Sequence, residues 1–103
     1  MLDTLNPRKV FISAAGVDER HGVTWHELDD AATKRRAIAH GIRRILLARS
    51  GLFDEVAPVN IAPLSAFDVL ISDCALPGEY PSYCRAAGIQ VITPDSDAES
   101  QLQ

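Results

Sequence analysis

The sequence lacks several features that would place a protein in a class at once. None of its apolar runs approaches the roughly twenty residues of a membrane-spanning helix, and no basic segment precedes an apolar one as in a secretory signal peptide. We therefore expect neither a membrane span nor a signal peptide, and a cytoplasmic location. Ten lysines and arginines stand against 14 aspartates and glutamates, a net charge of −4, so the chain alone should not bind DNA strongly.

Cysteine and glycine are also scarce, with two and six residues in a chain of 103. Cys74 and Cys84 do not have the paired spacing of zinc ligands, and we expect reduced thiols. His21 and His26 could coordinate a metal, but no third ligand stands at a recognisable spacing, so no metal site is expected. The glycines form neither a Walker loop nor a dinucleotide-binding fingerprint, and no nucleophile motif is present. We therefore expect no cofactor.

What the sequence does contain is an alternation of short apolar segments with segments of helical spacing. The length fits one domain with a single core. The alternation predicts an α/β fold with a parallel sheet. The predicted strands are 10–15, 45–48, 68–72 and 90–93, with a short one at 59–61, and the predicted helices are 28–40 and a second from about 77 to Gly88. Strand 10–15 is apolar without alternation, which favours an interior position covered on both faces.

Polar residues follow three of these strands. A glycine-containing polar loop, 17–26, follows the first, Arg49 and Ser50 follow the second, and Asp73 follows the third. Open α/β sheets usually bind ligands beyond the carboxyl ends of their strands. One or two cations among hydroxyl and amide groups suit a small anion such as a phosphorylated sugar, although each could be an ordinary loop residue. The candidate ligand-binding residues are Gly16, Asp18, Thr24, Lys34, Arg49 and Ser50.

Helix 28–40 carries the candidate Lys34. Its apolar positions outline a face of mostly small residues that would let it lie close to a sheet: Leu28, Ala31, Ala32, Ile38 and Ala39. Asp30 and Lys34 are four residues apart with the acid first, so they can pair. Either Asp30 orients Lys34 toward an anionic ligand, or the two form an exposed helix pair of little energetic weight.

Four blocks of the chain, in order and spacing, resemble the carboxyl-terminal effector domain of DeoR-type bacterial transcription repressors. The blocks are VFISAAGV (10–17) with GVT (22–24), DAATKR (30–35), ILLARSGLF (45–53) with Val59 and 62–64, and FDVLISD (67–73) followed by 76–77, 87–88 and 91–92. The resemblance covers most of residues 9–94.

The resemblance implies a fold shared with ribose-phosphate isomerases and coenzyme A transferases, here a partial three-layer sandwich around a parallel sheet. It also implies a sensor of phosphorylated sugars that is not an enzyme. In the family a helix-turn-helix domain and a glycine-rich phosphate loop precede the matching region, so DNA would be reached only through a domain absent from this chain. We expect residues 1–103 to form one domain, the carboxyl-terminal portion of such a sensor, with 95–103 a disordered tail.

The chain departs from the family where members commonly read Leu-Ala-Asp-Ser-Ser-Lys-Phe. Here Arg49 replaces the aspartate and Leu52 the lysine, which moves the positive charge. A sugar-phosphate isomerase-like enzyme is the alternative, but the stretch 13–18 lacks the acid that would move a proton. A purely structural oligomerisation module is a third possibility. Self-association is expected in any case, because strands 10–15 and 45–48 would otherwise leave an edge or face exposed.

Overall fold

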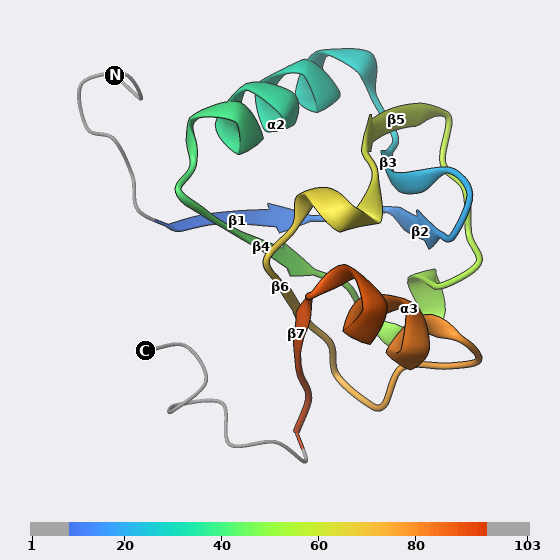
Figure 1. Ribbon diagram of the computed structural model, residues 1–103. Helices are drawn as coiled ribbons and strands as arrows, with labels where there is room; N and C mark the ends of the chain where they lie inside the picture. The colour runs from blue at the N-terminus through green and yellow to red at the C-terminus, as the bar shows by residue number, and fades with distance from the viewer. Residues whose placement is uncertain (1–8, 95–103) are drawn as a thin grey trace.

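The computed structural model describes residues 9–94, which form a four-stranded parallel sheet in the order β1-β4-β6-β7 (Figure 1). The strands and helices are β1 (Lys9–Ser13), β4 (Arg43–Leu47), β6 (Val69–Ile71), β7 (Gln90–Ile92), α2 (Leu28–His40) and α3 (Tyr80–Ala87). The predicted α/β class, its parallel sheet and both helices are thus confirmed. The tail predicted at 95–103 lies outside the described residues.

A second, antiparallel sheet was not predicted. It consists of β2 (Gly16–Asp18), β3 (Gly22–Trp25) and β5 (Val59–Ala62) in the order β2-β3-β5. The segment 17–26, expected as a loop, is therefore mostly a β-hairpin. Strands of three or four residues leave almost no periodic pattern, and β3 finds its second partner, β5, far along the chain. Two 3₁₀ turns complete the described elements, η1 (Ser50–Leu52) and η2 (Leu64–Ala66).

The expectation that strand 10–15 is interior and covered on both faces is wrong. Within the described residues β1 pairs only with β4, so it is an edge strand of the parallel sheet. Its residues alternate between buried and exposed, with Ile12 buried and Phe11 54% exposed. The neighbouring strand β4, by contrast, does have buried residues on both faces, Ile45 and Leu46.

Helix α2 begins and ends where expected but buries a narrower face. Glu27 is the N-cap, and Gly41 follows the last turn and donates its N–H to Ala37 O. Of the five residues predicted for the buried face, only Ala31 and Ile38 are buried, whereas Leu28 is 66% exposed. Gly88 ends α3 in the left-handed conformation, as its position predicted.

Alternation along the parallel strands separates the core into two clusters. In the larger one, Ile12, Leu46 and Leu70 from one face of the sheet contact the helices and the antiparallel sheet. The opposite face carries a smaller cluster of Ile45, Val69 and Ile92. The register pairs Ile12 with Leu46 and Leu46 with Leu70, which places these three side chains on the same face.

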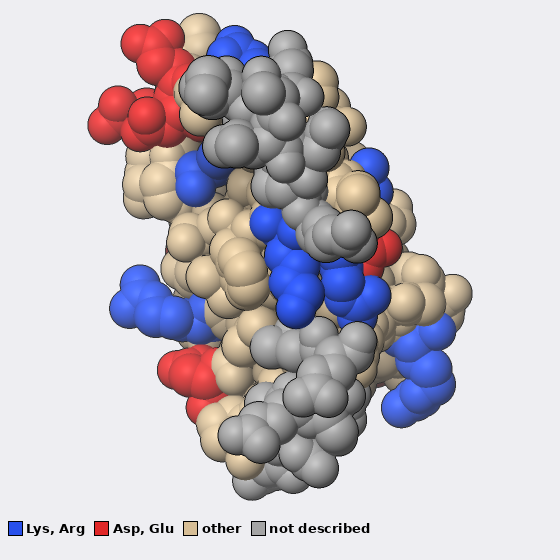
Figure 2. All heavy atoms as spheres, turned by 90° about the vertical axis from the view of Figure 1, so that its left-hand side faces the viewer, with Lys and Arg blue, Asp and Glu red and all other residues tan. Residues whose placement is uncertain are grey.

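Basic side chains gather at the centre of one side of the molecule, the side where β1 and β4 begin (Figure 2). At the start of β4, the Arg43 Nη2 donates to Gln90 Oε1 at 2.9 Å, and the Arg44 Nε donates to Ile38 O at 2.7 Å. The Asp68 carboxylate accepts from the Arg44 backbone N–H at 2.8 Å. These two arginines therefore join β4 to α2, β6 and β7, at the end of the sheet opposite to the one where ligands usually bind.

Candidate functional site

A cleft of about 430 Å³ lies where three neighbouring parallel strands end. We call it the strand-end cleft. Its lining comes from the ends of β1, β4 and β6 and from η1, and consists of Ser13, Ala14, Leu47, Ala48, Arg49, Leu52, Ile71, Ser72 and Asp73. Because the strands are parallel, their carboxyl ends meet at one edge, which is where open α/β sheets place ligands. A cleft therefore lies at the edge of the sheet where the sequence predicted a ligand, and the ligand itself stays a prediction.

Asp73 holds the two sides of this cleft together. Its Oδ1 accepts a hydrogen bond of 2.8 Å from the Ser50 backbone N–H and one of 3.4 Å from the Ser72 hydroxyl. The bond from Ser50 is the main reason that the pKa of Asp73 is lowered, and the Ser72 hydroxyl adds to the effect. The exposed carboxylate is therefore ionised at neutral pH and links the end of β6 to η1.

Arg49 supplies the positive charge of the strand-end cleft. It is exposed and immediately precedes η1, so its guanidinium is accessible to a ligand. Leu52 adds an apolar, half-buried side chain on the same turn. Hydroxyl groups come from Ser13 and from Ser72. One cation, one carboxylate and two hydroxyls around an open cleft can bind a small polar anion but contain no obvious proton relay.

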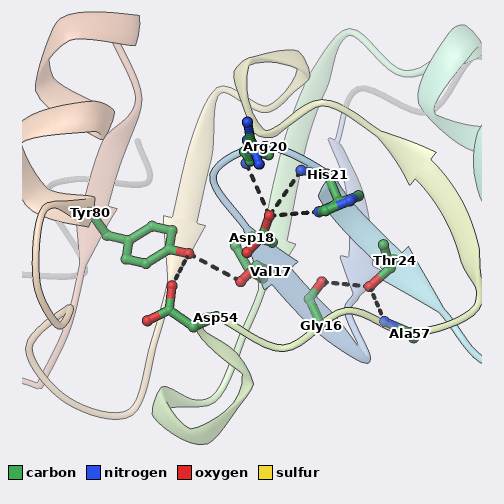
Figure 3. A network of polar contacts seen from close by, with 9 residues as sticks. All are labelled: Gly16, Val17, Asp18, Arg20, His21, Thr24, Asp54, Ala57 and Tyr80. Atoms are coloured by element: carbon green, nitrogen blue, oxygen red, sulfur yellow. Dashed lines mark hydrogen bonds and ion pairs between the residues drawn. The ribbon is translucent and has the colours of Figure 1, made fainter.

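Thr24 and Gly16, two of the six candidates, lie inside the antiparallel sheet (Figure 3). Thr24 is fully buried, and its Oγ1 donates to Gly16 O at 3.3 Å and accepts from the Ala57 N–H at 2.9 Å. A Cβ on Gly16 would lie 2.4 Å from Glu55 O, so a glycine is needed for this close approach. The structure thus gives both residues a packing role and does not place them in the strand-end cleft.

Asp18 and Lys34 have partners elsewhere as well. Asp18 is the last residue of β2, and its Oδ2 accepts from the backbone N–H groups of Arg20 and His21 in the turn and contacts His21 Nδ1 at 2.8 Å. These bonds, that with the His21 side chain above all, lower the pKa of Asp18. The Lys34 Nζ lies 3.9 Å from the centre of the Trp25 ring, a cation–π geometry. Burial lowers the pKa of Lys34, against the opposing effect of the Asp30 charge.

Of the six candidates, the structure therefore places Arg49 in the lining of the strand-end cleft, and Ser50 borders it through its backbone bond to Asp73. The other four lie in the antiparallel sheet or in helix α2. Ser13 and Ser72 line the cleft and were not selected. Ser72 ends the predicted strand 68–72, which was a signal, whereas Ser13 lay inside the predicted strand 10–15 and ends the observed β1. Asp73 was recognised as a strand-end residue, but its bond to Ser50 depends on the tertiary structure.

Tyr80 connects α3 to the segment that follows η1 (Figure 3). Its hydroxyl donates to Asp54 Oδ1 at 2.8 Å and contacts Val17 O at 3.3 Å. Burial, together with Asp54, raises the pKa of Tyr80 to about 12. Asp54 adopts a positive φ of 70° and donates its N–H to Val17 O at 2.7 Å. This junction fixes the position of the turn that borders the strand-end cleft.

Residues 9–94 contain no group of three or more histidine, cysteine or acidic side chains arranged to hold a metal ion. Over the same residues, neither helix has the length and apolar character required to cross a membrane.

Comparison with known proteins assigns the family. The model of the DeoR C terminal sensor domain matches residues 1–74. The chain therefore belongs to the DeoR C-terminal sensor domain family, the class that the parallel sheet and its strand-end cleft fit.

Characterised relatives are transcription regulators. The chain is 30% identical to the deoxyribose operon repressor of Escherichia coli K12 over an aligned region of 91 residues. This region is 88% of this chain and 36% of that protein. It is 31% identical over 85 residues to the HTH-type transcriptional regulator IolR of Bacillus subtilis, covering 82% and 34%. It is 27% identical over 93 residues to the L-fucose operon activator of Haemophilus influenzae, covering 89% and 37%. The chain thus spans little more than a third of the length of these relatives.

Proposed function

We propose that this chain is the effector-binding part of a DeoR-type transcription regulator and that it binds a phosphorylated sugar, or a similar small anion, in the strand-end cleft. The observation that carries the proposal is the convergence of Arg49, Ser72 and Asp73 at the carboxyl ends of adjacent parallel strands. A guanidinium is suited to a phosphate, since it donates two parallel hydrogen bonds.

The remaining groups of the cleft suit a sugar. The ionised Asp73 carboxylate can accept hydrogen bonds from sugar hydroxyls, and Ser13 and Ser72 can donate or accept. Two of the relatives are regulators of operons named for sugars, deoxyribose and L-fucose. Arg49, in the position where we expected an aspartate from the family pattern, favours a ligand with more negative charge near η1.

Binding without catalysis is the role that the cleft supports. Its one acidic group, Asp73, has a lowered pKa, so it is a poor proton donor and a weak general base at neutral pH. This argues against the isomerase-like alternative. In the proposed function the ligand signal passes to a DNA-binding domain outside this chain, in the cytoplasm, and the chain does not itself contact DNA.

We also propose that the chain associates with further copies of itself. Phe11 on the edge strand β1 is 54% exposed, and Ile42, just before β4, is 68% exposed. Exposed apolar side chains on and beside the edge strand of a sheet favour association. Sedimentation as a monomer at micromolar concentration would contradict this part of the proposal and leave ligand binding unaffected.

The ligand proposal is tested by calorimetry with the purified chain and a panel of sugar phosphates, each paired with its unphosphorylated sugar. We expect binding of at least one phosphorylated sugar, and affinity for it reduced about tenfold in Arg49→Met, the loss of a charge-assisted hydrogen bond. Arg36→Met is the matched control, because Arg36 is an exposed arginine of α2 that lines none of the clefts described here. Equal weakening in both variants, or no binding of any sugar phosphate, would refute the proposal. Turnover of a sugar phosphate would support the isomerase alternative instead.

A further inference from the structure

A second cleft, of about 380 Å³, lies beside the β2–β3 turn. We call it the hairpin cleft. It is bounded by the turn, by β5 and η2, and by one side chain each from α2 and α3, and its lining consists of Glu19, Arg20, His21, Gly22, Arg35, residues 60–64 and Tyr83. The hairpin cleft and the strand-end cleft have no lining residue in common. Whatever binds in one does not directly contact the residues of the other.

The hairpin cleft collects positive charge from two distant parts of the chain. Arg20 comes from the β2–β3 turn and Arg35 from the middle of α2. The Arg35 Nη2 donates a hydrogen bond to Asn60 O, which holds the guanidinium against the β5 wall. The lining holds two arginines and one acidic side chain, Glu19, and the Asp18 carboxylate lies beside the lining at His21, so an anion would be attracted by the guanidinium donors themselves and not by an excess of positive charge. A guanidinium already held in place loses less conformational entropy when it binds an anion.

His21 adds a third group whose orientation is set by Asp18 (Figure 3). Asp18 Oδ2 lies 2.8 Å from His21 Nδ1 and also accepts both backbone N–H groups of the turn, from Arg20 and His21. The pKa of Asp18 is lowered by these bonds, so the carboxylate is charged. With Nδ1 directed at Asp18, the ring geometry points Nε2 away from it. When the imidazole is protonated, Nε2 can donate a hydrogen bond to an anion in the cleft.

The floor of the hairpin cleft is apolar. Ile61 and Leu64 are buried, and the Tyr83 ring is half-buried beside them. Gly22 brings the turn close to β5, since a Cβ at this position would lie 2.4 Å from Ala62 O and its φ is +74°. The cleft therefore combines hydrogen-bond donors with an apolar surface, a combination that suits a small phosphate monoester.

From these observations we propose that the hairpin cleft is a second anion site, which binds the phosphate group of a small phosphate monoester through Arg20, Arg35 and His21. The proposal is independent of ligand binding in the strand-end cleft.

The test is an NMR titration of the ¹⁵N-labelled chain with inorganic phosphate, added to about 20 mM so that a site with a millimolar Kd is saturated. We expect the backbone amides of Gly22 and Ala62 to shift along a saturating curve. The same spectra report on the strand-end cleft through Ala48 and Ser72. In Arg49→Met the shifts of Gly22 and Ala62 should persist. A chain that binds phosphate in only one of the two clefts would therefore show shifts at only one of the two pairs of amides.

Arg20→Met is the informative variant, because the interaction that fixes Arg20 is its backbone bond to Asp18, and replacing the side chain keeps that bond. We expect phosphate to bind about fivefold or more weakly in Arg20→Met, the loss of one charge-assisted hydrogen bond. Arg36→Met, the neighbour of Arg35 on α2, is the matched control and should bind as the wild type does. The proposal is overturned by the absence of a shift at Gly22 and Ala62, by unchanged binding in Arg20→Met, or by equal weakening in Arg20→Met and Arg36→Met.

Discussion

Thr24 allows the structural and the ligand-binding roles of a candidate residue to be separated. Its side chain is fully buried, and its hydroxyl joins three segments by donating to Gly16 O and accepting from the Ala57 N–H. Thr24→Val keeps the shape but removes both bonds. The N–H of Ala57 is then left without its partner, and the expected loss of unfolding free energy is about 2–3 kcal/mol.

Thr24→Ser is the matched control. It keeps the hydroxyl and loses one buried methyl group, for which we expect a loss of about 1 kcal/mol. Both variants are measured by urea unfolding at constant pH, followed by the fluorescence of Trp25, the single tryptophan of the chain, and by circular dichroism. The difference between the two variants, about 1–2 kcal/mol, then measures the hydrogen bonds of the hydroxyl.

Two results would refute this reasoning. If Thr24→Val is as stable as Thr24→Ser, the hydroxyl does not stabilise the antiparallel sheet. If Thr24→Val is stable and folded but no longer binds the sugar phosphate that the wild type binds, Thr24 serves the ligand, as its sequence position first suggested. We expect neither, because the hydroxyl lies in the interior of the sheet and not in the strand-end cleft.

Two further predictions concern Tyr80 and Lys34. Because the pKa of Tyr80 is raised from 10.0 to about 12, ionisation favours the unfolded chain in that interval, so stability should fall as pH rises from 10 to 12. Tyr80→Phe should lower the free energy of unfolding by only about 1 kcal/mol at neutral pH, because the exposed Asp54 carboxylate then bonds to water instead. The same variant should no longer lose stability between pH 10 and 12, whereas the control Tyr83→Phe should lose it as the wild type does. Identical pH profiles of stability in the wild type and both variants would contradict this assignment to Tyr80. Lys34→Met should reduce the free energy of unfolding by about 0.5–1 kcal/mol and alter the fluorescence emission of Trp25, because it removes the cation–π contact. The affinity for a sugar phosphate, measured by calorimetry, should not change. A loss of affinity without a loss of stability would instead support the ligand-binding role inferred from the sequence.

Local sequence patterns determined the class of fold and its boundaries. Apolar segments separated by helical spacing predicted the parallel strands and both helices, and the glycines at 41 and 88 predicted where the helices end. These features depend on neighbours within a few residues, so they can be recognised in the chain itself. The position of Arg49 after a buried strand was likewise enough to place it beside the strand-end cleft.

The tertiary structure alone decided which partners the polar side chains have. Lys34 was assigned to Asp30 by helical spacing, yet its ammonium lies on Trp25, because β3 runs beside α2. Asp18 was considered as a ligand residue and instead organises a hairpin turn.

The antiparallel sheet likewise depends on contacts between segments that are distant in the sequence. Pairing of β3 with β5 joins residues more than thirty positions apart, and strands this short carry too little pattern to reveal it. The hairpin cleft exists only because this pairing brings the β2–β3 turn beside β5, with Arg35 of α2 against the same strand. The sequence therefore determined the parallel strands and the two helices, since their causes are local. The tertiary structure decided the antiparallel sheet and the sites, since contacts between distant segments create them.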